Sequence, residues 1–105
     1  LQTIDLTTGS GPEVAAGASV TVQYCGLGLT SRRVFDSSWA RGEPVSFGLD
    51  GVIVGWQEGI PGMQVGGRRV LVIPGDLAYG PTPPGAGILP DETLVFVVDL
   101  LAIDS

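Results

Sequence analysis

The sequence of 105 residues contains no histidine, no lysine and a single cysteine, Cys25. Without histidine the chain cannot form a histidine-based catalytic triad or a zinc site with histidine ligands. One cysteine cannot form an internal disulfide, and Cys25 lies in a strand-like segment where we expect an unreactive thiol. A phosphate-binding loop is excluded because its lysine is missing. We therefore expect no metal and no cofactor, and an enzyme of this composition works without a nucleophile or a general base.

Positive charge and long apolar runs are also scarce. All five basic residues are arginines, the net charge is −6, and only Arg32–Arg33 and Arg68–Arg69 are adjacent pairs. This distribution offers no basic stripe that could follow a phosphate backbone, so we expect no nucleic-acid partner. The longest apolar run is broken by Asp99 and is far shorter than the roughly 20 residues that span a bilayer. The acidic residues are too scattered for the paired carboxylates of a glycosidase.

The remaining composition predicts one compact, soluble domain over residues 1–105, which we expect to be a monomer. Hydrophobic residues make up 44% and charged residues 15%, which argues against disorder. The 17 glycines and 8 prolines follow no repeat and are typical of turns between strands. Because the sequence begins at Leu1 without an initiator methionine, we expect a processed or excised piece of a longer precursor. The compartment stays open: the domain is expected to be either cytoplasmic or exported.

Apolar residues that alternate with other residues predict a strand-rich fold. In Ser19–Gly26, the residues Val20, Val22 and Tyr24 share one face, as expected for a half-buried strand. Further strands are predicted at Thr3–Leu6, Val45–Leu49, Arg68–Ile73 and Leu94–Ile103.

One segment, Val52–Ile60, has helical periodicity, with Ile53, Trp56 and Ile60 on one stripe. Gly55 and Gly59 weaken this helix, so it needs a sheet packed against its stripe. The prediction is an α+β fold in which an antiparallel sheet of five to six strands wraps around one short α-helix.

Five short motifs occur in a fixed order along the chain. They are VFDSS at Val34–Ser38, VIVGWQEG at Val52–Gly59, DLAYG at Asp76–Gly80, ILP at Ile88–Pro90 and TLVFVVDLL at Thr93–Leu101. Their order and spacing resemble the FKBP-type peptidyl-prolyl cis–trans isomerases, the immunophilins that bind tacrolimus and rapamycin. The resemblance implies an isomerase that assists protein folding and binds proline-containing polypeptides and macrolides of this type.

The resemblance also implies roles for individual residues. Trp56 matches the indole floor under the proline ring, Tyr79 matches a hydroxyl that bonds a substrate carbonyl, and Asp36 matches the single carboxylate of the pocket. These three are the expected catalytic residues. The expected substrate-binding residues match other parts of the family's pocket. Val52 and Ile53 match its apolar rim, where the Ile53 N–H would hold a substrate carbonyl, and Ile88 matches the tip of a closing loop. The walls are matched by Tyr24, Phe35, Phe47 and Phe96, with Val45 on the outer wall.

Prolyl isomerisation suits a chain without conventional catalytic groups. Rotation about an amide has a barrier of roughly 18–20 kcal/mol, and lowering it by about 5–6 kcal/mol gives turnover on the order of 100 per second. An apolar pocket disfavours the planar amide, whose charge is delocalised, relative to the twisted amide. Without the motifs, the same aromatics would be ordinary core residues. A non-catalytic module that binds proline segments or a macrolide, and a structural domain with a vestigial pocket, are the alternatives.

Some positions depart from the family pattern. Val45 stands where an aromatic is often found, and Gly87 replaces a bulky residue at the loop tip, so we expect weaker macrolide binding. Trp39 is large for a loop, where it either covers a sheet edge or contacts a partner.

Overall fold

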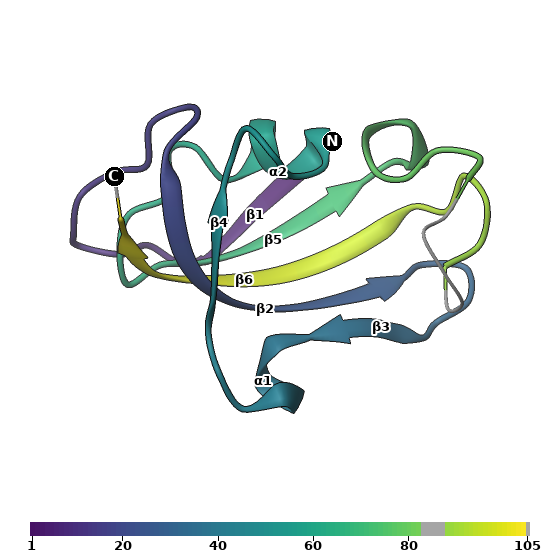
Figure 1. Ribbon diagram of the computed structural model, residues 1–105, viewed down its shortest axis with the longest axis horizontal. Coiled ribbons are helices and arrows are strands. Elements are labelled where there is room, and N and C mark those ends of the chain that lie inside the picture. The colour runs from purple at the N-terminus through teal and green to yellow at the C-terminus, as the bar shows by residue number, and fades with distance from the viewer. Residues whose placement is uncertain (83–87, 105) are drawn as a thin grey trace.

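The computed structural model describes residues 1–82 and 88–104. It shows one six-stranded antiparallel sheet, two short α-helices and one 3₁₀ turn (Figure 1). In chain order the elements are β1 (Gln2–Thr7), β2 (Ser19–Gly28), β3 (Val34–Ser37), α1 (Ser38–Arg41), β4 (Val45–Gly48), α2 (Val54–Gly59), β5 (Arg68–Ile73), η1 (Gly75–Leu77) and β6 (Leu94–Ile103). The predicted α+β class and the number of strands are confirmed. Gly87, one of the two positions expected to weaken macrolide binding, lies outside the described residues.

The long strands β2 and β6 form the centre of the sheet. The strand order is β1-β5-β6-β2-β3, and β4 pairs with the first half of β2 while β3 pairs with its last residues. Val20, Val22 and Tyr24 are buried on one face of β2, as their alternation predicts. Strand β2 is bent (Figure 1). Strands β3 and β4 pair with different parts of the same edge of β2, and helix α1 connects them. This arrangement leaves room on the inner face of the sheet for a helix.

Helix α2 packs on this inner face through a glycine contact. It is shorter than the predicted Val52–Ile60, but Trp56 and Ile60 are buried as expected. A Cβ atom at Gly55 would collide with the side chain of Ile73 on β5. The glycines that weaken the isolated helix are therefore what allows it to approach the sheet.

Helix α1 was not predicted from the sequence. The side chain of Ser37 accepts a hydrogen bond from the backbone N–H of Ala40 (3.2 Å) and caps the helix, while Gly42 ends it with a φ of 82°. Trp39 belongs to this helix rather than to a loop, and Arg68 lies over its ring at 5.9 Å from the ring centroid. Arg68 in turn forms two hydrogen bonds with Asp99 on β6. Trp39 therefore contacts the outer side of the sheet through Arg68, although 40% of the residue stays exposed.

Candidate active site

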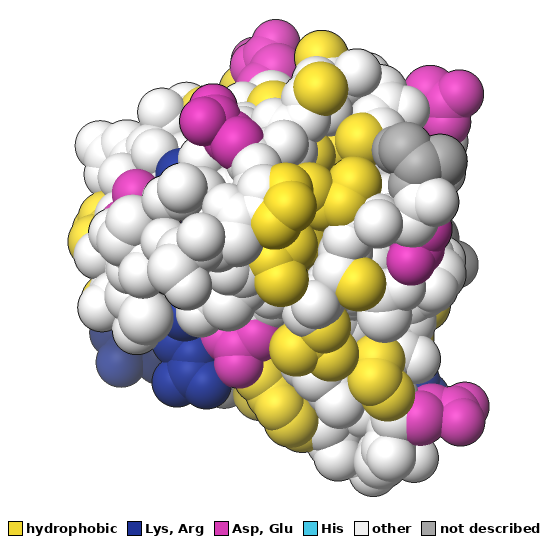
Figure 2. Space-filling model, turned by 90° about the vertical axis from the view of Figure 1, so that its left-hand side faces the viewer, with side chains coloured by type: hydrophobic (Ala, Val, Ile, Leu, Met, Phe, Trp, Pro, Cys, Tyr) yellow, Lys and Arg dark blue, Asp and Glu magenta, His cyan; other side chains and the backbone are white. Residues whose placement is uncertain are grey.

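A cavity of about 250 Å³ lies between helix α2 and the inner face of the sheet. Side chains from four strands, from α2 and from the segments next to α2 and η1 converge on it. The lining residues are Tyr24, Asp36, Phe47, Gly51, Val52, Ile53, Trp56, Tyr79 and Phe96. Figure 2 shows a band of accessible hydrophobic side chains that runs from top to bottom of one face, and most of the basic side chains visible in this view lie at lower left.

Trp56 stands at the centre of an aromatic cluster. Its ring centroid lies 5.2 Å from that of Tyr24, 5.2 Å from that of Phe47 and 5.3 Å from that of Phe96. All three pairs are close to perpendicular, which is the favourable edge-to-face arrangement of aromatic rings. The indole is 3% exposed, and its N–H has no hydrogen-bond acceptor within the described part of the chain. The cavity thus has a rigid aromatic base.

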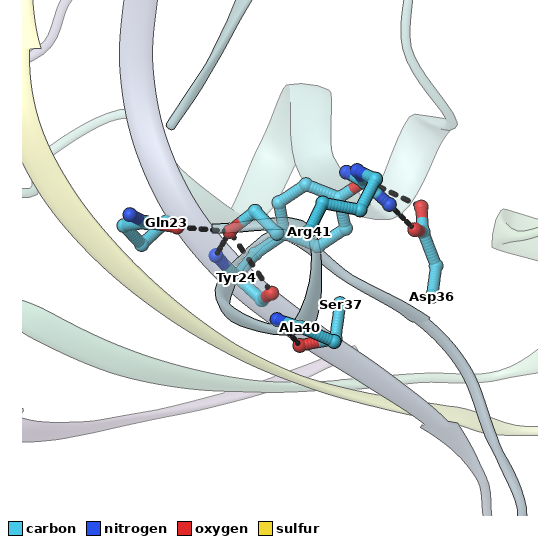
Figure 3. Close-up of polar contacts among 7 residues, drawn as sticks. Gln23, Tyr24, Asp36, Ser37, Ala40 and Arg41 are labelled. Carbon is cyan, nitrogen blue, oxygen red and sulfur yellow. Dashed lines mark hydrogen bonds and ion pairs between the residues drawn. The ribbon is translucent and has the colours of Figure 1, made fainter. Parts of the chain in front are cut away.

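Among the described residues that line the cavity, Asp36 is the one that carries a carboxylate, and this carboxylate interacts with two other side chains. It accepts a hydrogen bond from the Tyr24 hydroxyl and forms an ion pair with Arg41 (Figure 3). Arg41 also donates to the Tyr24 hydroxyl (3.1 Å), and its guanidinium lies 5.7 Å from the centroid of the Tyr24 ring. Burial and the hydrogen bond to Asp36 raise the pKa of Tyr24 above its ordinary value, so the phenol is neutral at physiological pH.

Helix α1 brings Arg41 to this position. The hydroxyl of Ser38, which is fully buried, accepts a hydrogen bond from the backbone N–H of Tyr24 (2.7 Å) and donates one to the Gln23 side chain (2.5 Å). These bonds fix α1 against β2 directly beside Tyr24, as Figure 3 shows. Sequence reasoning missed Arg41 because it did not anticipate α1. The signal that could have identified it is the serine before the helix, which is a typical N-cap.

Two further hydrogen-bonding groups border the cavity. The carbonyl of Ile53 accepts from the backbone N–H groups of Trp56 and Gln57 and begins α2, whereas its own N–H has no backbone acceptor within residues 1–82 and 88–104. Tyr79 follows the 3₁₀ turn and is 37% exposed. Burial, followed by the negative charge of Asp36, raises the pKa of Tyr79. The two groups can therefore serve as neutral hydrogen-bond donors to a ligand.

Three of the residues predicted for the site do not line the cavity in the described structure: Phe35, Val45 and Ile88. All three are partly buried against the core. Phe35 packs against Phe96, which lines the cavity; the two rings are perpendicular and their centroids lie 5.6 Å apart. In contrast, Gly51, which lies before α2, does line the cavity. The motifs had not indicated Gly51 as a site residue. Within the described residues, no group of three or more cysteine and acidic side chains could hold a metal ion.

Comparison with known proteins decides the family. A sequence profile described as FKBP-type peptidyl-prolyl cis-trans isomerase matches residues 11–101. The chain belongs to this family. It is 50% identical over 98 residues to the probable FK506-binding protein of Corynebacterium glutamicum, covering 93% of this chain and 82% of that protein. It is 49% identical over 102 residues to the FK506-binding protein of Streptomyces anulatus, covering 94% of this chain and 82% of that protein.

A solved structure agrees with this assignment. The crystal structure of a peptidyl-prolyl cis-trans isomerase from Pseudomonas syringae superposes with a TM-score of 0.88 at 38% identity, covering 98% of this chain and 74% of that chain. This FKBP-type chain is thus a peptidyl-prolyl cis–trans isomerase with the fold of its family. None of the helices in the described part of the chain has the length and apolar character to cross a membrane.

Proposed function

We propose that the cavity over Trp56 is the isomerase site and that the prolyl ring of the substrate rests on the indole. The observation that carries this proposal is the convergence of three aromatic rings on Trp56 in a cavity of about 250 Å³, with one carboxylate and two hydroxyls beside it. Pockets that bind small apolar groups have this composition of apolar walls and few polar groups. The proline ring supplies the apolar group.

The polar groups at the cavity serve to orient the peptide. In this proposal the Ile53 N–H and the Tyr79 hydroxyl each bind a carbonyl that flanks the prolyl bond, and Asp36 fixes Tyr24. Binding energy from these contacts holds the amide where it can twist, and the aromatic walls withdraw water from its delocalised charge. No covalent step or proton transfer is required in this proposal.

The walls take up the residues next to proline. Phe47, Val52 and Phe96 form the inner wall, and Phe35, Val45 and Ile88 are proposed to contribute only when a ligand reaches beyond the cavity. We propose that macrolides of the tacrolimus (FK506) and rapamycin type bind at the same place. The names of the two relatives at about half identity, both FK506-binding proteins, support this part of the proposal.

The test is the rate of cis–trans exchange of a short Xaa-Pro peptide as a function of protein concentration, with and without a chelator. We expect a linear increase that the chelator does not change. Trp56→Leu should remove most of the acceleration, whereas the matched variant Trp39→Leu, outside the cavity, should retain it. Macrolide or peptide binding without acceleration would instead show a non-catalytic module, and a flat response at micromolar protein without binding would overturn the proposal.

A further inference from the structure

Glu92 is the one charged residue that is buried among those the structure describes, with 5% of its surface exposed. No arginine pairs with it in the described part of the chain. Its charge is instead satisfied by backbone N–H groups: Oε1 accepts from Leu89 (2.9 Å), and Oε2 accepts from Ser31 (2.6 Å) and Thr30 (3.1 Å). These bonds lower the pKa of Glu92, the bond from Leu89 most. The three backbone donors stabilise the charged form of this buried carboxylate and hold it in a fixed position.

The three donors come from two segments far apart in the sequence. Thr30 and Ser31 belong to the connection between β2 and β3, which is also held by a bond from the Leu29 N–H to the Thr93 carbonyl (2.9 Å). Leu89 begins a tight turn that Glu92 closes with its own N–H (3.2 Å), and Asp91 in this turn has a φ of 56°. The Glu92 carboxylate therefore fastens the turn at residues 89–92 to the β2–β3 connection.

This turn is also joined to the cavity. The N–H of Asp91 donates to the carbonyl of Gly80 (2.8 Å), whose N–H donates to the carbonyl of Gly75 (2.8 Å). Gly80 directly follows Tyr79, which lines the cavity, and Leu89 directly follows Ile88. A displacement of the turn would consequently move the backbone of Tyr79 and Ile88.

We propose that Glu92 is a positioning residue of the isomerase, which sets Tyr79 and Ile88 relative to the cavity by clamping the turn onto the β2–β3 connection. The proposal rests on the assignment of the cavity as the substrate site. The negative charge is essential to it, because both carboxylate oxygens accept from N–H groups. A glutamine at this position offers one acceptor oxygen, and its amino group would face a donor.

Gly28 on β2 offers an independent way to disturb the same contact. A Cβ atom at this position would lie 2.3 Å from Oε2 of Glu92 and 2.5 Å from its Cδ and Oε1, and these are the three atoms nearest to it. Gly28→Ala should therefore displace the carboxylate from its donors while leaving its charge in the protein. Asp91→Asn provides the matched control, since it removes the neighbouring charge, and asparagine tolerates the left-handed conformation of the turn.

The test combines amide hydrogen exchange with peptide binding and turnover. In Glu92→Gln we expect the amides of Thr30, Ser31 and Leu89 to exchange about tenfold faster, as for the loss of one charge-assisted hydrogen bond. We expect KM for an Xaa-Pro peptide, and its Kd followed by Trp56 fluorescence in a Trp39→Phe background, to rise several-fold while kcat changes little. Gly28→Ala should act in the same direction, and Asp91→Asn should change neither exchange nor KM.

The outcomes separate this proposal from the assignment of the cavity. Faster exchange with unchanged KM and Kd would reduce Glu92 to a purely structural role, and unchanged exchange would show that there is no clamp; either result overturns the proposal. If the unsubstituted protein bound the peptide without turnover and Glu92→Gln weakened that binding, the isomerase site would fail while the positioning role stood. Absence of peptide binding in the unsubstituted protein would overturn both.

Discussion

The hydroxyl of Tyr24 on β2 donates a hydrogen bond to the carboxylate of Asp36 on the neighbouring strand β3. Arg41 contacts both groups and closes a triangle of polar contacts at the edge of the aromatic cluster. Asp36 and Arg41 are about half exposed, so their ion pair is screened by solvent and contributes little to stability by itself. Its more direct effect is on the protonation and orientation of Tyr24.

The ionisation of Tyr24 provides a first prediction. The chain has two tyrosines, so in a Tyr79→Phe background the absorbance of tyrosinate reports on Tyr24 alone. We expect its pKa to lie above 10.0, to fall in Asp36→Asn and to rise in Arg41→Gln, because Asp36 raises the pKa and Arg41 lowers it. A shift of the same sign in both variants would contradict this account.

The same shift has a consequence for stability at high pH. Because the pKa of Tyr24 is raised in the folded state, its contribution is fully present below the ordinary tyrosine pKa and is lost as the pH rises through the folded value. Denaturant midpoints in the Tyr79→Phe background should therefore fall as the pH exceeds about 10. In Asp36→Asn this fall should be smaller.

Periodicity predicted which way two of the residues that line the cavity point, whereas their assignment to a pocket came from the resemblance carried by the five motifs. The alternation in β2 placed Tyr24 on the inner face, and the helical stripe placed Trp56 against the sheet. Phe35 was harder to place, because β3 has four residues and its register with β2 shifts between Gly26 and Leu27, so alternation does not determine which way a side chain points.

Other features depend on contacts that no local pattern contains. Helix α1 has four residues, too few for a helical periodicity, and Arg41 was missed with it. Glu92 would be expected at the surface as a charged residue, yet its donors Thr30 and Ser31 lie 62 and 61 positions away. Only the folded chain brings these backbone groups together.

A second prediction concerns Trp56, whose side chain holds the aromatic cluster together. Trp56→Ala should leave a cavity between α2 and the sheet and lower the free energy of unfolding by about 3–5 kcal/mol. Trp39→Ala is the matched control, and since Trp39 is 40% exposed we expect a much smaller loss. Urea denaturation of both variants checks this.

Asp36→Val should keep the fold and mainly weaken the binding of ligands that carry a hydroxyl. If Asp36→Val unfolded the domain and Trp56→Ala did not, the roles assigned to the two residues would be reversed.

The contact between Gly55 and Ile73 makes a third prediction. Gly55→Ala should destabilise the domain by about 1–3 kcal/mol through overpacking, more than the roughly 0.5–1 kcal/mol that alanine adds to a helix. Gly59→Ala should be milder, because its closest contact is the end of the Leu71 side chain at 2.9 Å, which can rotate. Ile73→Ala, which removes all three Ile73 atoms nearest to the Cβ at position 55, should relieve part of the cost of Gly55→Ala, and a double-mutant cycle would detect this as a non-additive free energy. Additivity would show that α2 shifts freely instead.

A fourth prediction follows from the lowered pKa of Glu92. Its stabilising contribution is present above the ordinary glutamate pKa and is lost as the pH falls through the lower, folded-state value. Urea midpoints measured between about pH 5 and about pH 2 should therefore fall with a smaller slope in Glu92→Gln than in the unsubstituted protein. Asp91→Asn should keep the steeper slope. Equal slopes in all three proteins would mean that the carboxylate is not selectively stabilised by its three backbone donors.

The last prediction concerns Val45, whose side chain is smaller than the aromatic that the family resemblance leads us to expect at this position. Val45 lies opposite Val22 and two residues before Phe47, on the face of β4 that borders the cavity, although it does not line the cavity itself. A phenylalanine at this position would extend the wall past Phe47, and roughly 40 Å² of added apolar contact at about 25 cal/mol per Å² is worth about 1 kcal/mol. Competition titrations should then show tacrolimus and rapamycin binding about fivefold tighter to Val45→Phe. Val34→Phe, the same change at an exposed position outside the cavity, should leave the affinity unchanged. Equal affinities of Val45→Phe and the unsubstituted protein would mean that bound macrolides do not reach this part of β4.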